Sequence, residues 1–143
     1  MDFVVNLIDW DQGKTELLAI RYTVFVDEQG VLEELEHDEH DRSALHLVAR
    51  AVDGRPVGTA RMLADGQIGR MAVLPDWRRR GVGSALLREL IRIAGDRGIR
   101  GPFLNAQCEA ESFYRKFGFV AEGEVFVDAG IAHRCMTLPK FEV

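Results

Sequence analysis

Hydrophobic residues recur along this chain with two different periods. Short apolar runs predict strands at residues 3–8, 45–52, 56–64, 67–74, 103–106, 119–124 and 131–138. Apolar positions spaced three or four residues apart predict amphipathic helices at residues 11–26, 82–95 and 109–117. The predicted order is strand, helix, acidic loop, three strands, helix, strand, helix and two final strands.

The turns and connections between these segments predict a mixed sheet. Asp53-Gly54 and Asp65-Gly66 separate three consecutive strands. Because both residues of an Asp-Gly pair accept a positive φ, these strands are expected to form an antiparallel meander. A helix joins the strands at 67–74 and 103–106, which predicts that they run parallel. The fold class is therefore mixed α/β.

Length and composition favour one soluble domain covering residues 1–143. No apolar run approaches the ~20 residues of a membrane helix, and the first residues lack the basic segment of an export signal. Cys108 and Cys135 are therefore expected to be free thiols in a reducing cytoplasm, with a disulfide between them as the alternative. The net charge of −5 disfavours nucleic acid as a partner.

Charge is distributed unevenly along the sequence. Eight acidic residues and no lysine or arginine lie between Asp27 and Asp41, hereafter the acidic segment, whereas Arg78, Arg79 and Arg80 are consecutive. An acidic and a basic region in one small domain indicate two ligands of opposite charge.

The basic run leads through glycines into the longest predicted helix, as Arg78-Arg79-Arg80-Gly81-Val82-Gly83-Ser84. The first amides of a helix have no internal partner, its dipole makes this end positive, and glycine lets a bulky anion reach the backbone. A phosphate, in particular a diphosphate, is the expected ligand. A solvated basic turn is the alternative, and Leu86 stands where a dinucleotide fingerprint has its third glycine.

Four segments together carry a family resemblance, namely Met71-Ala72-Val73-Leu74-Pro75, Arg78-x-x-Gly81-x-Gly83, Asn105 and Phe113-Tyr114-x-x-Phe117-Gly118-Phe119. In order and spacing they resemble the GCN5-related N-acetyltransferases, the GNAT superfamily. A further motif is Arg21-x-x-Val24-Phe25-Val26-x-Glu28-Gln29, which is followed by the rest of the acidic segment. Together they are similar to the small bacterial acetyltransferases of the ElaA-like subgroup.

The resemblance implies a three-layer fold with antiparallel N-terminal strands, a splayed parallel central pair and helices on both faces. It implies acetyl-CoA as the co-substrate, whose thioester an N–H of the central strand would polarise; an ordinary, fully paired strand is the alternative. It also favours a homodimer, for which residues 125–127 and 131–138 offer apolar strands. The expected cofactor-binding residues are Met71, Ala72, Val73, Arg78, Arg79, Arg80, Gly81, Val82, Gly83, Ser84 and Asn105.

The catalytic expectations concern one acid and one base. In the family a tyrosine faces the cofactor sulfur at the position of Tyr114, so Tyr114 is expected to protonate the departing thiolate, with core packing as the alternative. No motif fixes the base that deprotonates the acceptor. Glu28 is the first choice because it ends the first helix near the expected acceptor cleft, and a solvated helix-end carboxylate is its alternative. The other candidates are ordered water and His37, His40, His46 and Glu111.

No metal is expected. His37-x-x-His40, with Asp38 and Asp41 nearby, has loose spacing and no accompanying cysteine, so polar surface or substrate contact is the preferred interpretation. A covalent mechanism through Cys108 lacks an activating base adjacent in sequence.

The sequence thus predicts an acetyl-CoA-dependent N-acetyltransferase. A small cationic amine, such as a polyamine or an aminosugar, is the expected acceptor because the acidic segment would attract it. A protein or peptide N-acetyltransferase and a non-catalytic acyl-CoA binding module are the alternatives. Neither nucleic acid nor a membrane is an expected partner.

Overall fold

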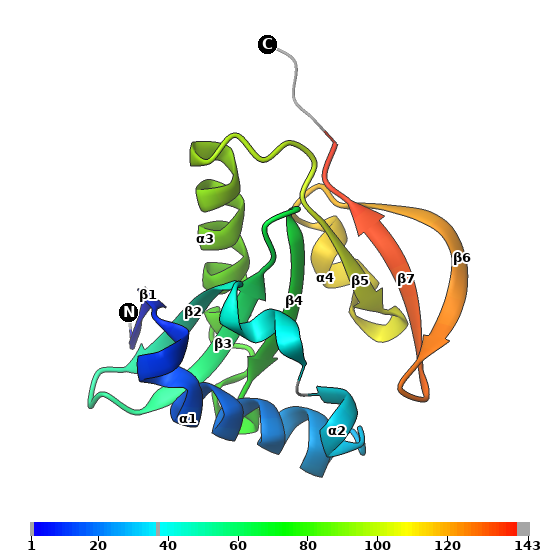
Figure 1. The fold of residues 1–143 in the computed structure, drawn as a ribbon. Helices are drawn as coiled ribbons and strands as arrows, with labels where there is room; N and C mark the ends of the chain where they lie inside the picture. Colours follow the sequence, from blue (N-terminus) through cyan, green and yellow to red (C-terminus); the bar gives the residue numbers. More distant parts are fainter. Residues whose placement is uncertain (1, 37, 140–143) are drawn as a thin grey trace.

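Seven strands form one mixed sheet in the computed structural model, which describes residues 2–36 and 38–139 (Figure 1). Across the sheet the strands follow the order β1-β2-β3-β4-β5-β7-β6. The pair β4–β5 is parallel and the other neighbouring pairs are antiparallel, which confirms the meander and the crossover. The strands are β1 (Phe3–Ile8), β2 (Leu45–Ala51), β3 (Pro56–Met62), β4 (Gln67–Val73), β5 (Phe103–Gln107), β6 (Val120–Asp128) and β7 (Ile131–Thr137).

The helices are less regular than the hydrophobic pattern predicts. The first predicted helix is α1 (Trp10–Arg21) continued by a π-helical segment, η1 (Tyr22–Glu28), and Gly30 ends it with φ +73°. The third is reduced to the 3₁₀ turn η4 (Cys108–Ala110) and α4 (Glu111–Arg115). The remaining elements are α2 (Glu33–Glu36), η2 (Glu39–Arg42), η3 (Pro75–Trp77) and the long α3 (Val82–Asp96).

Helices α1 and α3 cover opposite faces of the sheet. Adjacent residues of a strand point to opposite faces, and on β2 Leu47 packs with the α3 side chains while Val48 packs with Leu17 of α1. Helix α3 approaches β3 closely at Gly58, where a Cβ would lie 2.9 Å from a methyl carbon of Val82. The fold is therefore the expected three-layer arrangement, with helices on both faces of the sheet (Figure 1).

The two ends of the sheet differ in burial. Strands β2 and β3 are almost wholly buried, whereas β6 forms an edge on which every residue except Ala121 is exposed.

Of the helices in the described part of the chain, none combines the length and apolar character needed to span a bilayer.

Candidate active site

A cleft opens where β4 and β5 separate. The two strands pair at Gln67–Phe103 and at Ile68–Leu104, and they diverge beyond these two positions (Figure 1). The resulting cleft has a volume of about 620 Å³ and is walled by β4, β5, η1, α4 and the turn between β6 and β7. The splayed parallel pair that the family resemblance implies is therefore present.

A bulge on β4 shapes one wall of the cleft. Thr59 of β3 pairs with Ala72 and Arg61 pairs with Gly69, so that Arg70 and Met71 together stand opposite one residue of β3. Arg70 takes a φ of +47°, which is uncommon for a residue other than glycine. A bulge breaks the regular ladder and redirects main-chain groups. The pairing of β4 with β5 has ended before the Met71–Val73 segment, and its assignment as a main-chain donor to the cofactor stays a prediction.

The start of α3 is led by a glycine, which follows a short run of arginines. Gly81 precedes the helix with φ +87°, Arg79 has φ +63°, and no side chain within the described residues caps this end. The first amides of the 15-residue helix are therefore left for a ligand, and the helix dipole favours a negative one. A diphosphate fits this arrangement of main-chain donors.

The predicted cofactor-binding residues divide into two adjacent groups. The side chain of Val82 is buried in the core, so only its main chain is available. The guanidinium of Arg80 lies 4.5 Å from the ring centre of Trp77. Those that line the cleft are Met71, Ala72, Val73, Arg78, Gly83 and Asn105, and those at the neighbouring helix start are Arg79, Arg80, Gly81, Val82 and Ser84.

Tyr114 presents its hydroxyl to the cleft wall formed by β4. Its Oη lies 4.0 Å from the sulfur of Met71, and both residues line the cleft. Its ring packs edge-on against Phe113 and Phe119, as the alternative of core packing expects, and the catalytic role of its hydroxyl stays a prediction. Burial raises the pKa of Tyr114 to about 12, which keeps the phenol protonated throughout the physiological range.

Glu28 lines the cleft but is already paired. Both of its carboxylate oxygens accept from Arg78, at 2.6 and 2.5 Å, and Arg78 also donates to the carbonyl of Val73 at 3.0 Å. These hydrogen bonds to Arg78 lower the pKa of Glu28 and make it a weaker base. Its assignment as the base stays a prediction, as does that of Arg78 as a phosphate ligand.

A second contact also crosses the cleft. The side-chain amide of Gln107, at the end of β5, donates to that of Gln29 at 2.8 Å. Together with the Glu28–Arg78 pair, it ties the end of η1 to both diverging strands.

The acidic segment is largely neutralised within the protein. Asp41 accepts from Arg21 and Arg61, and Glu36 is paired with Arg21. Asp38 is held by Arg61 and Arg70, whose charges outweigh the effect of burial and lower its pKa to about 2. These three carboxylates are therefore already paired with arginines distant in sequence, and the expectation that the acidic segment attracts a cation stays a prediction.

Three of the other base candidates, His40, His46 and Glu111, do not line the cleft. His46 is buried against Trp10, with Nε2 2.8 Å from the carbonyl oxygen of Asp41, and burial lowers its pKa. Glu111 pairs with Arg115 and Arg134, and His40 is exposed on η2. His37 lies outside the described residues. Within residues 2–36 and 38–139 there is no group of three acidic, histidine or cysteine side chains arranged to hold a metal.

Glu109, Asp128 and His133 are among the cleft-lining residues that were not predicted as site residues from the sequence. Asp128 and His133 come from the β6–β7 hairpin, which only the sheet order places beside β5. The alternation of side chains along the last strand is the one signal in the sequence that bears on His133. Cys108 and Cys135 are free, as expected, and neither lines the cleft.

A splayed parallel pair beside an uncapped, glycine-led helix defines an acyl-CoA-dependent N-acyltransferase fold, and comparisons with known proteins agree. The chain belongs to the GNAT acetyltransferase family, because residues 11–140 match the Acetyltransferase (GNAT) domain. It is also 41% identical over 119 residues to the "Uncharacterized N-acetyltransferase YjcF" of Bacillus subtilis, which covers 80% of this chain and 84% of that protein.

Two solved structures extend this comparison. ElaA of Escherichia coli superposes with a TM-score of 0.82 at 26% identity, covering 96% of this chain and 99% of that one. An acyl-CoA N-acyltransferase of Pseudomonas aeruginosa gives a TM-score of 0.81 at 28% identity, with 95% and 97% coverage. The protein is therefore an acyltransferase that uses acyl-CoA as its co-substrate, and its likeness to the ElaA-like subgroup is confirmed.

Proposed function

We propose that this protein, acting as a single domain over residues 1–143, transfers an acetyl group from acetyl-CoA to the amine of a small cationic molecule. The observation that carries this proposal is the cleft, because the uncapped start of α3 lies at one wall and unpaired carboxylates lie at another. The first feature suits an anionic donor and the second suits a cationic acceptor.

The donor side follows from the helix start and the β4 bulge. Acetyl-CoA supplies an activated thioester carbonyl. The amides from Arg79 to Ser84 are proposed to bind its diphosphate, with the arginine side chains adding charge. A main-chain N–H of Met71–Val73 is proposed to polarise the carbonyl, and Asn105 to contact the pantetheine arm. Tyr114 is proposed as the donor to the departing sulfur.

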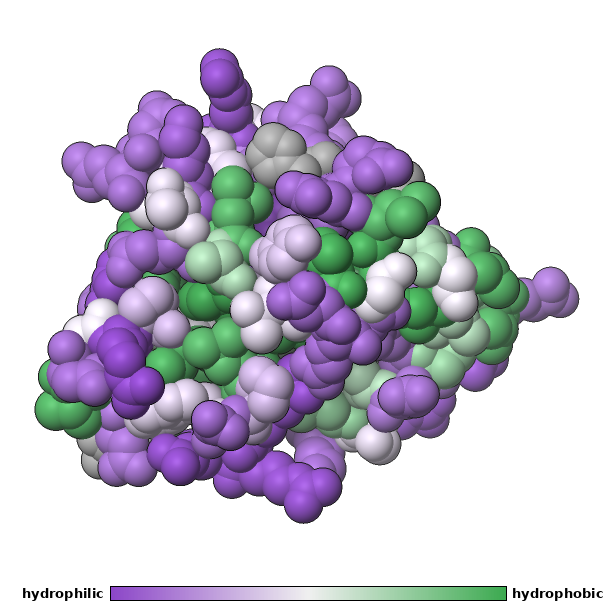
Figure 2. All heavy atoms as spheres, turned by 90° about the horizontal axis from the view of Figure 1, so that it is seen from below, coloured by the Kyte–Doolittle hydropathy of each residue, from purple (hydrophilic) through white to green (hydrophobic). Residues whose placement is uncertain are grey.

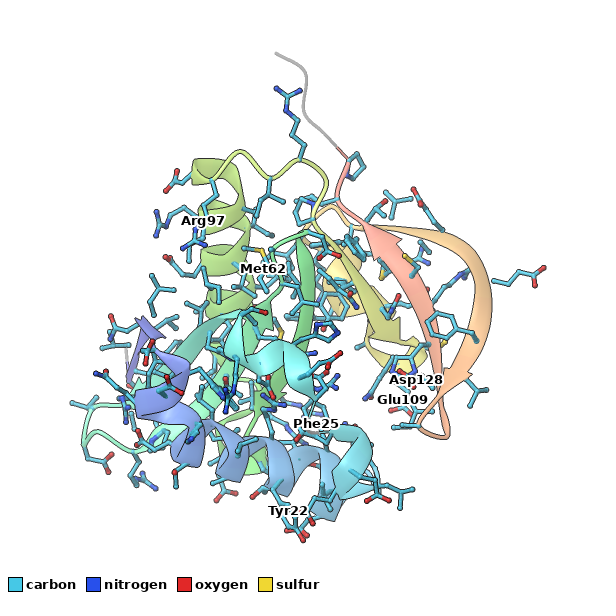
Figure 3. The ribbon with its side chains drawn as sticks, viewed as in Figure 1. Tyr22, Phe25, Met62, Arg97, Glu109 and Asp128 are labelled. Atoms are coloured by element: carbon cyan, nitrogen blue, oxygen red, sulfur yellow. The ribbon has the colours of Figure 1, made fainter. Side chains whose placement is uncertain are left out.

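The acceptor side is proposed to lie between η1 and the β6–β7 turn. Glu109 and Asp128 line the cleft from the side of β5–β7, and Phe25 lines it from η1 (Figure 3). Both carboxylates are exposed, and neither belongs to an ion pair among residues 2–36 and 38–139. They therefore take over the role that the sequence analysis assigned to the whole acidic segment, namely the attraction of a cation.

The proposal is tested with purified protein, acetyl-CoA and a panel of amines, followed by release of free thiol. Polyamines and aminosugars are expected to give at least about tenfold higher kcat/KM than anionic amines such as glutamate, because the cleft entrance is acidic. A preference for anionic acceptors would contradict the proposed substrate class. Turnover on lysine peptides alone would indicate a protein acetyltransferase, and binding without turnover on any acceptor would indicate a sensing module.

Two glycines provide a matched control for the donor site. Gly81 and Gly54 have φ values of +87° and +94°, and neither has an atom within 4 Å of the position of an added Cβ. Valine therefore imposes the same backbone strain at both. Gly81→Val is expected to weaken acetyl-CoA binding at least about tenfold by calorimetry, whereas Gly54→Val, in the β2–β3 turn, retains it. Equal affinities would remove the helix start from the donor site.

We also propose a homodimer formed through β6. Val125, Phe126 and Val127 are 54%, 38% and 73% exposed on this edge strand. Seen from below, hydrophobic surface gathers at the right-hand end of the molecule, on the side of the β6–β7 hairpin (Figure 2). An exposed edge strand offers unpaired main-chain groups to a second copy, and two antiparallel β6 strands would satisfy twofold symmetry.

The dimer is tested by sedimentation velocity. The unmodified protein is expected to sediment as a dimer, and Val127→Lys as a monomer because it places a charge in the apolar strand edge. A monomeric unmodified protein would contradict the proposal.

A further inference from the structure

His133 lines the cleft and has no role in the function proposed above. It lies in β7, opposite Gln107 of β5 and Phe126 of β6. Gln107 is the last residue of β5, so His133 lies toward the end of β5 that is away from its pairing with β4. Its side chain is half-buried. Of the three histidines that the structure describes, His133 belongs to the cleft lining, whereas His40 and His46 do not.

One hydrogen bond fixes which nitrogen of His133 carries the proton. Its Nδ1 lies 2.7 Å from the main-chain oxygen of Ile131. A carbonyl oxygen only accepts, so Nδ1 must be the donor. In the neutral imidazole Nε2 is then unprotonated, and its lone pair is available to take a proton. A general base requires this tautomer, and a histidine commonly has it set by the bond that its other nitrogen makes.

A second contact fixes the orientation of the ring. Phe126 on the neighbouring strand stacks on His133, with the ring centres 5.8 Å apart and the planes inclined at 22°. Nδ1 is occupied by its hydrogen bond and one face of the ring is covered by Phe126. The atom of the imidazole that remains to accept a proton is therefore Nε2. The β6–β7 hairpin therefore holds a positioned base rather than a freely rotating side chain.

The charges around His133 come from three elements. Glu109 on η4 and Asp128 at the end of β6 line the same cleft, and both are acidic. Arg134 follows along β7, but it donates to the carbonyl of Gly123 and pairs with Glu111. Carboxylates in the same cleft suit a site that receives an ammonium group.

Glu28, Glu36 and Tyr114, which also line the cleft, are less suited to this role. Glu28 is held in a two-point ion pair by Arg78, and Glu36 is buried against Arg21. Both carboxylates would have to leave an arginine before accepting a proton. Tyr114 is a protonated phenol at physiological pH.

We propose that His133 is the general base that deprotonates the acceptor amine, an assignment that rests on the function proposed above. Nε2 takes one proton from the ammonium, and the lone pair that this frees attacks the thioester carbonyl carbon. The N–C bond forms and the C–S bond breaks. Tyr114 gives its phenolic proton to the departing sulfur and recovers one from the amide nitrogen, so the single proton released overall leaves from His133 to solvent.

The test compares two acceptors in the unmodified protein and in His133→Gln. At about pH 8 an alkylamine with a pKa of ~10.4 is charged and needs the base, whereas its fluorinated analogue is already neutral. For the alkylamine, His133→Gln is expected to lower kcat/KM by about a hundredfold or more, and for the fluorinated amine by only a few-fold. Glutamine keeps a hydrogen-bonding side chain but is not a base, so the difference between the two losses reports the proton transfer.

His40→Gln is the matched control, because His40 is exposed and lies outside the cleft lining. It is expected to leave both rates unchanged. Equal losses with both acceptors in His133→Gln, or no loss with either, would overturn the assignment while the proposed function stands. Binding of acetyl-CoA with no turnover on any amine would instead overturn the proposed function, and the assignment with it.

A measurement independent of activity uses long-range ¹H–¹⁵N spectra of the imidazoles. Neutral His133 is expected to show a protonated Nδ1 and an unprotonated Nε2. The opposite tautomer would remove the lone pair from Nε2 and overturn the assignment. A further variant, His133→Ala, is expected to regain part of its rate with added imidazole, and the absence of such rescue with the alkylamine would count against a base at this position.

Discussion

Replacing Arg21 with methionine is expected to destabilise the protein by about 3–5 kcal/mol. The guanidinium is 1% exposed and is paired with Glu36 and Asp41, both of which are buried. Without Arg21, the remaining ion-pair partner of Glu36 is Arg70, at 3.8 Å, and the remaining partner of Asp41 is Arg61. Each of the two buried carboxylates therefore loses one of its two arginines. A buried charge that loses its partner costs far more than the pair itself contributes.

Urea unfolding, monitored by fluorescence of Trp10 and Trp77, measures this loss. Arg50→Met is the control, since Arg50 also pairs with a carboxylate through two hydrogen bonds but Arg50 and Glu16 are partly exposed. It is expected to lose no more than about 1 kcal/mol. Similar losses in the two variants would show that burial does not govern the Arg21 contacts.

The same experiment has a defined pH dependence. Burial alone would raise the pKa of Asp41, but its bonds to Arg21 and Arg61 outweigh burial and lower the pKa below its ordinary value of 3.8. A lowered pKa stabilises the folded state above about pH 4, and this stabilisation is lost as the pH falls through the lowered value. The difference in unfolding free energy between the unmodified protein and Arg21→Met is therefore expected to narrow below about pH 4.

Replacing Tyr114 with phenylalanine is expected to lower kcat by about a hundredfold and to leave acetyl-CoA affinity unchanged. The ring keeps its packing against Phe113 and Phe119, and the hydroxyl loses a contact only with the sulfur of Met71. A pKa of about 12 makes Tyr114 a weak acid. The hydroxyl therefore acts mainly as negative charge develops on the sulfur, so its removal affects turnover and not binding.

Steady-state kinetics with calorimetry of acetyl-CoA separates these two effects. Tyr22→Phe is the matched control, because Tyr22 is exposed on η1 and does not line the cleft. Ultraviolet titration is expected to lose the transition near pH 12 in Tyr114→Phe alone. An unchanged kcat in this variant would remove Tyr114 from the mechanism.

The pairing of β2 with β3, β3 with β4 and β4 with β5 could be predicted from the sequence because local chemistry decides it. Gly54 and Gly66 adopt φ values of +94° and +95° in the two Asp-Gly turns, whereas Asp53 and Asp65 do not take a positive φ, so the hairpins form with the glycine alone in the left-handed region. The crossover helix likewise fixes β4 and β5 as parallel. The separation of β4 and β5 was predicted through the family resemblance and not from periodicity, because no alternation pattern distinguishes a paired strand from a splayed one.

The charged part of the site could not be predicted in this way. The acidic segment looks solvated in the sequence because Arg21, Arg61 and Arg70, which neutralise it, come from α1, β3 and β4. The π-helical turn of η1 was likewise predicted as ordinary helix, since its apolar spacing is almost the same. His133 was missed because its place beside the cleft depends on β7 lying between β5 and β6.

β4 and β5 are paired at only two positions, and this short seam divides the sheet into two parts. One plate consists of β1, β2, β3 and β4, and the other of β5, β7 and β6. The spacing between the plates is set by this seam, by the helices packed on them, and by the side-chain contacts that bridge the gap, Glu28 to Arg78 and Gln29 to Gln107. Because β4 and β5 share no main-chain pairing beyond Ile68 and Leu104, exchanging a side chain on the rim does not break a sheet ladder.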